Sequence, residues 1–496
     1  MNEHPKHPFI DLPRRAFWKS GVAEPNMFEI SDLWTPKLEI LPTTRVVTFG
    51  SCFAQHIGRA LKKRGYGWLS TEPAPPGLSP QNAKKYSYDV FSARTGNIYT
   101  TSMLRQWVEW ASGIKATPTE TWQRAGRFYD PFRPSIEKDG FASVEECLRA
   151  REFTLTTFRK AIEEADIFVF TLGLTESWYN CVDGYEYAVC PGTVAGKFDP
   201  QKHVFKNQDY AFILNNLTAA IEMMRDINPH IRVLLTVSPV PLTATKTDRH
   251  VVVATMASKS VLRAVADYAA NSWDSGARIV PIREIEGDLS DWQMSGSVSS
   301  SEGVISISGP SSNPFSGIKR RLEKLGRSDA VVLGFDVETE SSLKLSISIS
   351  PAPATRRNGK TVVQEIEGRG RVDLELKAGW DGELCLWIGA GAEVGQFHIS
   401  NFSCIVQTIA QPAQIDYFPS YEIINSPVFG GVFFEANKRE VSQFGVDFVM
   451  SHFFAGLSPV APVVPKGHTP ATKKEKTEMD VICDESLLEA FAGVKA

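Results

Sequence analysis

The sequence predicts an α/β fold built on a parallel sheet, with a β-sandwich inserted late in the chain. In the first half, short apolar runs alternate with amphipathic helical segments, as in parallel sheets whose two faces are covered by helices. Residues 287 to about 410 instead alternate apolar and polar side chains with a period of two, which is typical of sandwiches of antiparallel strands. The strand and helix pattern resumes after residue 410, so the β-rich stretch is expected to interrupt one α/β domain.

The expected organisation has five parts. They are an N-terminal arm rich in Pro and aromatic residues (1–42), the first part of the α/β domain (43–286), the inserted sandwich (287–410), the final part of the α/β domain (411–457) and a tail rich in Pro and Lys (458–496). The arm shows no clear period and is expected to lie extended on the fold. The tail is expected to be mostly disordered, with one short helix over 484–493.

Within the α/β part, each expected strand is a short apolar run, and each expected helix has apolar residues on one face. The expected strands are 43–50, 166–173, 231–241 and 277–282, and the stretch 415–424 leads on to a final helix. The expected helices are 51–66, 158–165, 210–227, 258–272 and 441–454. The first helix carries Lys62, Lys63 and Arg64 near its C-terminal end, where they complement the helix dipole.

The inserted stretch contains its own signals. Leu343, Leu345, Ile347 and Ile349 are expected to share one face of a strand. One short basic piece, 316–326, has helix-like spacing and is expected to interrupt the strands.

The end of the inserted stretch, residues 384–407, resembles in pattern the last strands of jelly-roll carbohydrate-binding modules. Trp380 and Trp387 could present flat rings to the apolar faces of sugars. The alternation predicts that Trp387 lies in the core, whereas the place of Trp380 stays open. A glycan is therefore an expected ligand of the inserted domain.

Composition excludes several classes of function. The formal net charge is -4 and no basic stripe is present, so nucleic acid is not an expected partner. The seven Cys show no CxxC spacing, and neither metal-ligand spacing nor a phosphate-binding loop between strand and helix is found, so neither metal nor cofactor is expected. The N-terminus lacks the apolar core of a signal peptide, and no run reaches the roughly 20 apolar residues of a transmembrane helix. A cytoplasmic location is expected.

The strongest candidate for chemistry is Gly50-Ser51-Cys52, where the first strand ends and the first helix begins. A side chain at this place faces the ligand-binding edge of an open α/β sheet and lies beside the N–H groups of a helix N-terminus, which favour a developing oxyanion. Gly50 would relieve crowding at the turn. Two other interpretations remain open. Ser51 could be only the N-cap of the helix, and Cys52 could be either a competing nucleophile or a small buried apolar residue. Arg94 and Asn97 could line the cleft, or they could simply lie in a polar loop.

Residues 50–54, GSCFA, form the motif that names the GSCFA family, and four further stretches resemble this family in the same order. They are TLGLTESW (171–178), TVSPVPL (236–242), SKSVLR (258–263) and YFPSYEII (417–424). The resemblance covers roughly 43–285 and 411–455 and extends to the SGNH (GDSL-like) hydrolases. It implies a three-layer α/β/α fold.

The resemblance also implies roles for single residues. Ser51 would stand at the position of the SGNH nucleophile, with its own N–H in the oxyanion hole. Gly173 lies at the end of the second strand, where the SGNH pattern carries a Gly followed two residues later by Asn. Together with the N–H groups of Ser51 and its neighbours, Gly173 would hold the oxyanion. Thr175 stands here at that second position, and its hydroxyl can donate one hydrogen bond. Glu176 follows as a nearby acid or a surface residue.

One part of the SGNH pattern is missing. Alignment on the last helix puts Asn437 and Glu440 where SGNH enzymes carry Asp-x-x-His, and a Ser hydroxyl is a weak nucleophile without an adjacent base. His250 could supply the base or be a solvated loop residue. Glu440 could do so if burial raised its pKa, or it could be a surface acid. The chain could also bind without turnover.

The resulting hypothesis is a serine esterase or acyltransferase acting on acyl esters of carbohydrate, in surface polysaccharide or glycoconjugate metabolism. The alternative is a catalytically inactive glycan-binding protein on an SGNH-like scaffold. A third possibility is a scaffold whose sandwich and tail dock other proteins.

Overall fold

The computed structural model describes most of the chain. The described residues are 7, 9–273, 275–276, 278–285, 292–301, 303–309, 316–325, 329–351, 359–379, 382–390, 395–410, 413–457, 484 and 488. They form two compact units, one of Met1–Ser275 with Ala413–Ala496 and one of Gly276–Pro412. The predicted disorder of 458–496 and the predicted helix over 484–493 lie, apart from Asp484 and Leu488, outside the described residues.

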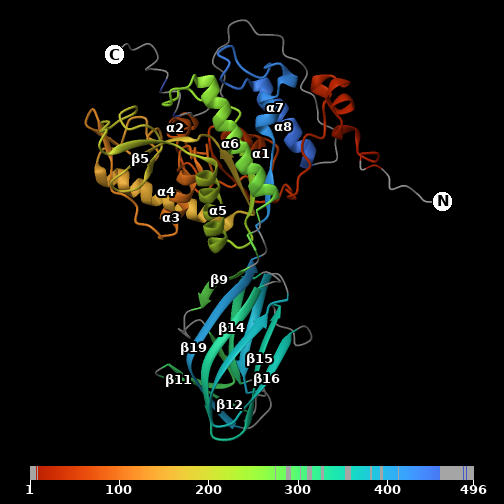
Figure 1. The fold of residues 1–496 in the computed structure, drawn as a ribbon. Helices are drawn as coiled ribbons and strands as arrows, with labels where there is room; N and C mark the ends of the chain where they lie inside the picture. Colours follow the sequence, from red (N-terminus) through yellow and green to blue (C-terminus); the bar gives the residue numbers. More distant parts are fainter. Residues whose placement is uncertain are drawn as a thin grey trace, which may run out of the picture. The chain divides into compact units, whose positions relative to one another are not determined.

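A parallel sheet forms the centre of the first unit (Figure 1), which confirms the predicted α/β class. In sheet order its strands are β1 (Val46–Gly50), β4 (Ile167–Leu172), β8 (Arg232–Val237) and β20 (Ile415–Tyr417), all mutually parallel. Trp68 adds a single parallel bridge to Val46 on the side of β1 away from β4. After β1 the chain therefore first returns to one edge of this strand, at Trp68, and later adds β4 at the other edge.

Both faces of this sheet are covered by helices, because most of its strand side chains are apolar and successive side chains point to opposite faces. Phe168 and Phe170 of β4 belong to the core on one face, and Ile167 and Val169 belong to the core on the other. The first core packs under α3 (Thr101–Ala111), α4 (Val144–Glu164), α5 (Tyr210–Ile227) and α6 (Val251–Asn271). The second packs under α1 (Ala54–Lys63), α7 (Ser420–Asn425) and α8 (Gln443–Leu457). The short α2 (Pro80–Lys85) has no buried residue.

The N-terminal arm is part of the second core. It contains three short helical turns, Arg14–Ala16, Lys19–Ala23 and Met27–Glu29. After them, Ile30, Trp34, Leu38 and Ile40 are buried with the side chains of α8. The arm is thus held by apolar burial and is not only laid on the surface.

Two small antiparallel sheets lie outside the parallel sheet. β2 (Trp122–Arg124) and β3 (Arg127–Tyr129) form a hairpin. β5 (Glu176–Asn180) pairs with both β6 (Glu186–Tyr187) and β7 (His203–Asn207). This second sheet follows directly after β4, at the carboxyl edge of the parallel sheet.

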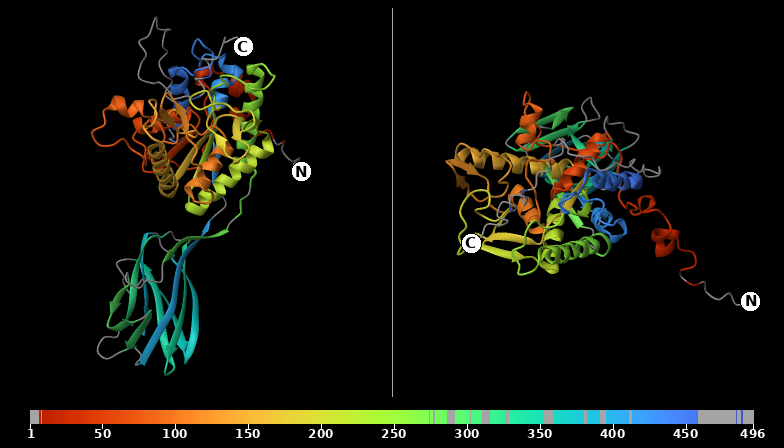
Figure 2. Two further views of the ribbon diagram at one scale, coloured as in Figure 1. Left: turned by 90° about the vertical axis from the view of Figure 1, so that its left-hand side faces the viewer. Right: turned by 90° about the horizontal axis from the view of Figure 1, so that it is seen from above.

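The second unit is a sandwich of two antiparallel sheets (Figure 2) around one apolar core. One sheet has the order β10 (Gln293–Ser295), β13 (Gly317–Leu325), β18 (Gly382–Gly389), β15 (Leu343–Pro351) and β16 (Lys360–Ile366). The other has the order β11 (Ser297–Ser301), β12 (Val304–Gly309), β19 (Gly395–Ala410), β14 (Asp329–Thr339) and β17 (Arg369–Lys377), with β9 (Arg278–Ile285) also paired to β19. The predicted face of Leu343, Leu345, Ile347 and Ile349 is confirmed, since all four are buried.

Three sequence predictions about the second unit are wrong. The strand expected at 277–282 does not extend the parallel sheet, because β9 pairs with β19 of the sandwich. The unit therefore begins before residue 287. The basic piece 316–326 is the strand β13 and not a helix, because its backbone pairs with both β10 and β18, and sheet context overrides local helix preference.

The third correction concerns Trp387. It is half-buried and lies outside the core of the sandwich, whereas its neighbours Leu386 and Ile388 are fully buried. Its indole lies against Gly317 and Gly389, where an added Cβ would approach the ring to 3.0 and 2.3 Å. The glycines make room for the ring on the outer face of the sheet. Trp380 lies outside the described residues.

Candidate functional site

Ser51 lies at the carboxyl end of β1, between the last strand residue, Gly50, and the first helical residue, Ala54. At this point the chain has one neighbour, β4, on one side and the bridge to Trp68 on the other. Reversals of this kind in an open α/β sheet create a crevice at the carboxyl ends of the strands, where ligands bind. The predicted location of Ser51, between the end of a strand and the start of a helix, is confirmed.

The hydroxyl of Ser51 is buried and unpaired. The residue is 2% exposed, and its Oγ has no hydrogen-bond partner among the described residues. The N-cap of α1 is Phe53, and no side chain caps the helix, so the interpretation of Ser51 as an N-cap is wrong. A buried hydroxyl without a partner costs about 1–3 kcal/mol, and such groups are rare enough in folded proteins to require a reason.

Two glycines bring the backbone close to Ser51. Gly50 has φ 124°, and a Cβ added there would lie 2.4 Å from the carbonyl oxygen of Thr171 in β4. A Cβ added at Gly173 would lie 3.0 Å from the Cβ of Ser51 and 3.1 Å from the ring of Tyr99. The end of β1, the loop after β4 and Tyr99 therefore converge on the serine.

Two of the amides expected in an oxyanion hole already donate hydrogen bonds within the protein. The N–H of Ser51 donates to the carbonyl oxygen of Thr171 at 3.0 Å, and the N–H of Gly173 donates to that of Tyr99 at 2.9 Å. An oxyanion could use these two donors only if those bonds opened. Cys52 is buried, at 6% exposed.

Thr175 and Glu176 hold neighbouring segments together. The buried Thr175 Oγ1 lies 2.7 Å from Asn207 Oδ1 and 3.1 Å from Ser258 Oγ, so it connects the loop after β4 with β7 and α6. The Glu176 carboxylate accepts hydrogen bonds from Thr245 Oγ1 at 2.5 Å and from the N–H of Lys246 at 2.9 Å. These contacts fix the segment between β8 and α6 against β5.

The predicted bases are not hydrogen-bonded to Ser51 in this arrangement. His250 is exposed and caps α6, because its Nδ1 accepts the N–H of Val252. Asn437 and Glu440 are both exposed and lie in the turn before α8. The Asn437 Oδ1 accepts the N–H groups of Arg439 and Glu440. The turn therefore uses the asparagine side chain for its own geometry.

Two other histidines are uncharged near neutral pH. Burial lowers the pKa of His56 in α1 to about 3 and that of His452 in α8 to about 4. Each ring packs on an aromatic neighbour, Phe53 and Phe448 respectively. Both act as apolar packing groups.

Sequence reasoning missed Lys259. This lysine of α6 is 1% exposed, and its Nζ donates to the carbonyl oxygen of Gly173 at 2.7 Å. It lies within the stretch SKSVLR, whose likeness to the family was the one signal that pointed to it. The contact ties α6 to the loop that touches Ser51.

Asp484 of the C-terminal tail was also missed. Its carboxylate accepts hydrogen bonds from Asn97 Nδ2 at 2.7 Å and from Ser135 Oγ, and its N–H donates to the hydroxyl of Tyr99 at 3.1 Å. Burial raises the pKa of Asp484. Asn97 lies in a loop, as one of the two interpretations expected, but it is buried there and its side chain binds Asp484.

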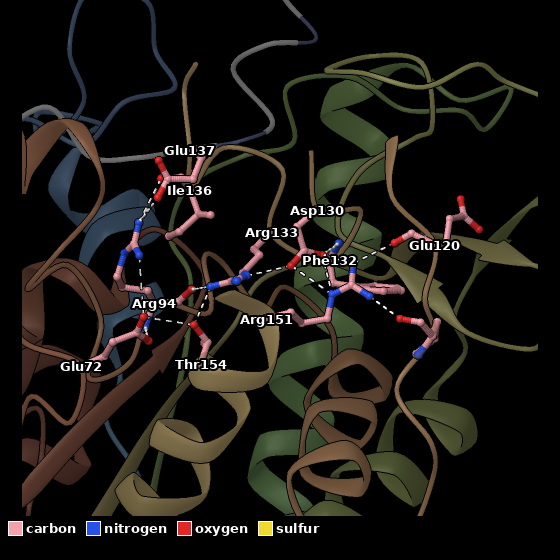
Figure 3. Close-up of polar contacts among 11 residues, drawn as sticks. Glu72, Arg94, Glu120, Asp130, Phe132, Arg133, Ile136, Glu137, Arg151 and Thr154 are labelled. Carbon is pink, nitrogen blue, oxygen red and sulfur yellow. Dashed lines mark hydrogen bonds and ion pairs between the residues drawn. The ribbon is translucent and has the colours of Figure 1, made fainter. Parts of the chain in front are cut away.

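Arg94, the other residue of that predicted loop, belongs to a buried network of charges (Figure 3). Its guanidinium lies 2.6 Å from Glu137 and 3.8 Å from Glu72. In the same network, Asp130 pairs with Arg133 at 2.8 Å and with Arg151 at 3.0 Å, all three fully buried. Burial alone would raise the pKa of Asp130, but the charges of Arg151 and Arg133 outweigh it and the pKa is lowered. The network supports the loops around the site.

A cavity of about 650 Å³ lies at the carboxyl edge of the sheet, next to the loop after β4. Tyr99 and Leu174 contribute to its wall, and so do Asp484 and Leu488 of the tail. The small sheet of β5 and β6 supplies further lining residues, among them Glu176 and Glu186. Its volume falls within the roughly 300–1,000 Å³ of small-molecule sites.

Comparison with known proteins gives one family and several partial likenesses. The model of the GSCFA family matches residues 45–278 and 400–453. No curated protein sequence matches the chain. Among the described helices, none has both the length and the apolar character needed to cross a membrane.

Three of the similar solved structures are carbohydrate-binding domains. A CBM4 structure is 12% identical, covers 25% of this chain and 94% of its own, and has a TM-score of 0.20. A cellulose-binding domain of Cellulomonas fimi β-1,4-glucanase C is 12% identical, with 24% and 87% covered and a TM-score of 0.21. A xylan-binding domain from Paenibacillus barcinonensis is 10% identical, with 28% and 98% covered and a TM-score of 0.22. Likenesses this low carry no argument about function.

Proposed function

The chain belongs to the GSCFA family, and from the geometry around Ser51 we propose that it is an SGNH-like serine esterase or acyltransferase acting on acyl esters of carbohydrate. The observation that carries the proposal is the Ser51 hydroxyl. It is buried, it caps no helix, and it has no partner among the described residues. It lies at the point of the sheet where ligands of open α/β folds bind.

The proposed reaction has two steps. The Oγ of Ser51 attacks the acyl carbonyl carbon and loses its proton to a base, and the bond from that carbon to the alcohol oxygen breaks as the alcohol takes a proton. The acyl group is then transferred from Ser51 to water in an esterase, or to an acceptor hydroxyl in an acyltransferase. Splitting the reaction through a covalent intermediate replaces one difficult step by two easier ones.

The mechanism needs a base that accepts the proton of the Ser51 hydroxyl. His250 and Glu440 remain the candidates, and both are exposed in this structure. Either would have to approach Ser51 when substrate binds, since catalytic hydrogen bonds are often absent before substrate is present. The Thr245 and Lys246 contacts to Glu176 lie in the segment that carries His250, so they would control this approach.

A fluorophosphonate probe tests whether Ser51 is activated. The purified protein is incubated with the probe, and the labelled peptide is located by mass spectrometry. We expect label on Ser51 and none on the Ser51→Ala protein. The matched control is Ser87→Ala, because Ser87 Oγ is also buried and has no partner in the described structure but does not lie between β1 and α1. Absence of label on folded wild-type protein would remove the hydrolase proposal.

One observation favours a second candidate, a glycan-binding protein without turnover. Trp387 lies on the outer face of the sandwich over two glycines, and aromatic surface of this kind suits the apolar faces of sugars. Calorimetry with soluble oligosaccharides separates the two candidates. Binding that survives Ser51→Ala, is lost in Trp387→Ala and is accompanied by no labelling of Ser51 would favour the binding protein.

A further inference from the structure

Two residues of the cavity wall contact Gly173, the residue that lies against Ser51. Tyr99 and Leu174 line the cavity. The carbonyl oxygen of Tyr99 accepts the N–H groups of both Gly173 and Leu174, and Gly173 is the residue that approaches the Cβ of Ser51. A molecule that reacts at Ser51 and extends past Tyr99 and Leu174 would place one of its arms in this cavity.

The wall of the cavity is mainly apolar. Several of its apolar side chains are buried, and others are half-buried. The lining includes Tyr99, Met103, Leu174, Trp178, Val189, Leu242 and Leu488.

The polar groups of the wall are almost all used within the protein. The two oxygens of the buried Glu186 accept hydrogen bonds from Thr100 Oγ1 at 2.6 Å, Ser102 Oγ at 2.5 Å and Tyr179 OH at 2.9 Å. Burial raises the pKa of this carboxyl group. Ser177 Oγ donates to the carbonyl oxygen of Lys206 and accepts from Gln208.

The same holds for two further carboxylates of the wall, those of Glu176 and Asp484. Glu176 is bonded to Thr245 and Lys246. Both carboxylate oxygens of Asp484 accept hydrogen bonds from Asn97 and Ser135. The charged side chains that remain in the wall, Lys197 and Lys246, belong to exposed residues. A sugar ring in the interior of the cavity would lose its bonds to water without gaining enough partners, which is unfavourable for each buried polar group.

We propose that this cavity binds the acyl arm of the ester substrate, and that this arm is an unbranched alkyl chain longer than an acetyl group. The assignment rests on the proposed reaction at Ser51 and adds the substrate's acyl class to it. The carbohydrate part of the ester would then lie outside this cavity. Burial of each methylene group is worth about a fourfold gain in affinity, so the cavity would select substrates by chain length.

Binding can be measured without turnover. The Ser51→Ala protein is titrated by calorimetry with sodium butanoate, hexanoate, octanoate and decanoate, each below its micelle-forming concentration. We expect affinity to rise by about fourfold per methylene until the cavity is full. Affinity that does not depend on chain length, or tighter binding of methyl glucoside than of octanoate, would overturn the assignment.

A filling variant ties the effect to this cavity. Ala188 is half-buried in the wall, and Ala188→Phe should shorten the chain length at which affinity stops rising. Val182→Phe is the control, because Val182 is 75% exposed in the turn after β5 and is outside the wall. The same dependence of affinity on chain length in both variants would contradict the proposal.

The outcomes separate this inference from the proposed function. Labelling of Ser51 together with no alkyl binding would support the proposed esterase and contradict the assignment of the cavity to the acyl arm. Alkyl binding that responds to Ala188→Phe, without labelling of Ser51, would keep the cavity and remove the esterase.

Discussion

The Nζ of Lys259 lies 2.7 Å from the carbonyl oxygen of Gly173, inside the protein. Gly173 in turn lies against the Cβ of Ser51. Hydrogen bonds from a charged donor are shorter and stronger than neutral ones. This bond therefore fixes the loop after β4 in the position where Gly173 meets the serine. A lysine used in this way has a positioning role and does not have to touch substrate.

Replacement of Lys259 by Met should remove this bond while keeping most of the side-chain volume. The buried carbonyl oxygen of Gly173 would lose its charged donor, at a cost of about 1–3 kcal/mol in the free energy of unfolding. If Ser51 is activated as proposed, the rate of fluorophosphonate labelling should fall in the folded Lys259→Met protein. Unchanged labelling, with urea denaturation showing the expected loss of stability, would assign the lysine to stability alone.

Substitution of Gly50 tests the close approach of β1 and β4. The residue has φ 124°, and an added Cβ would lie 2.4 Å from the Thr171 carbonyl oxygen. We expect Gly50→Ala to lose more than about 3 kcal/mol, because it combines an unfavourable backbone conformation with a clash. Gly65→Ala is the control, since it also has positive φ but nothing within 4 Å of an added Cβ. Thermal unfolding curves should show a much smaller shift for the control.

Asp130 holds the buried charges of Figure 3 together. Asp130→Asn would leave Arg133 and Arg151 buried with weaker compensation, and breaking such a pair costs about 3–5 kcal/mol. Tryptophan fluorescence during urea unfolding would measure the loss. Glu163→Gln breaks a solvent-exposed pair with Arg159 and should cost roughly 0–1 kcal/mol. Equal losses for the two variants would contradict a central role for Asp130.

The effect of Asp130 should also depend on pH. The pKa of Asp130 in the folded protein is lowered, whereas in the unfolded protein this carboxyl group has a pKa of about 3.9. The folded state therefore binds fewer protons than the unfolded state. The stabilisation is thus complete above that value and is lost as pH falls through the lower folded pKa. The stability difference between wild type and Asp130→Asn should be constant above about pH 5 and should narrow in acid. A difference that does not narrow would oppose this assignment.

Asp484 should make binding of the tail depend on pH in the opposite sense. Its described partners, Asn97, Ser135 and Tyr99, are uncharged, and burial raises its pKa. The bound tail therefore holds a proton more tightly than the free tail, and binding weakens as pH rises from the ordinary value of about 3.9 through the raised one. Hydrogen-exchange protection of a peptide containing Asp484 would measure this. Asp484→Asn should remove the pH dependence, and an unchanged dependence would contradict it.

The sequence was informative where one physical signal decided the outcome. Apolar runs such as residues 166–173 predicted a buried parallel strand, and β4 lies there because its side chains enter both cores. The strand-to-helix junction placed Ser51 correctly at the edge of the sheet. Period-two alternation correctly predicted the buried face of β15.

The failures have a common physical origin, because they depend on contacts between distant segments. Alternation identifies a strand at 277–282 but cannot say which sheet it joins. The basic residues of β13 suggested a helix surface, and its real partners are β10 and β18. A lysine in an amphipathic helix normally faces water, so the burial of Lys259 under Gly173 leaves no local signal. The same is true of Asp484, which lies in a polar tail and accepts a hydrogen bond from Asn97, a residue far away in the sequence.

The position of the second unit within the chain has a consequence for biosynthesis. The chain leaves the first unit at Ser275 and returns to it at Ala413, whose N–H donates to Ser275 Oγ. The last strand, β20, then pairs with β8. During synthesis the ribosome must therefore complete the whole sandwich before β8, already paired with β4, gains its second neighbour, β20. Until then the apolar strand Arg232–Val237 has an open edge, and open apolar edges favour pairing between chains. Rapid folding of the sandwich on the ribosome would shorten this exposure, and the yield of native protein should be sensitive to mutations that slow it.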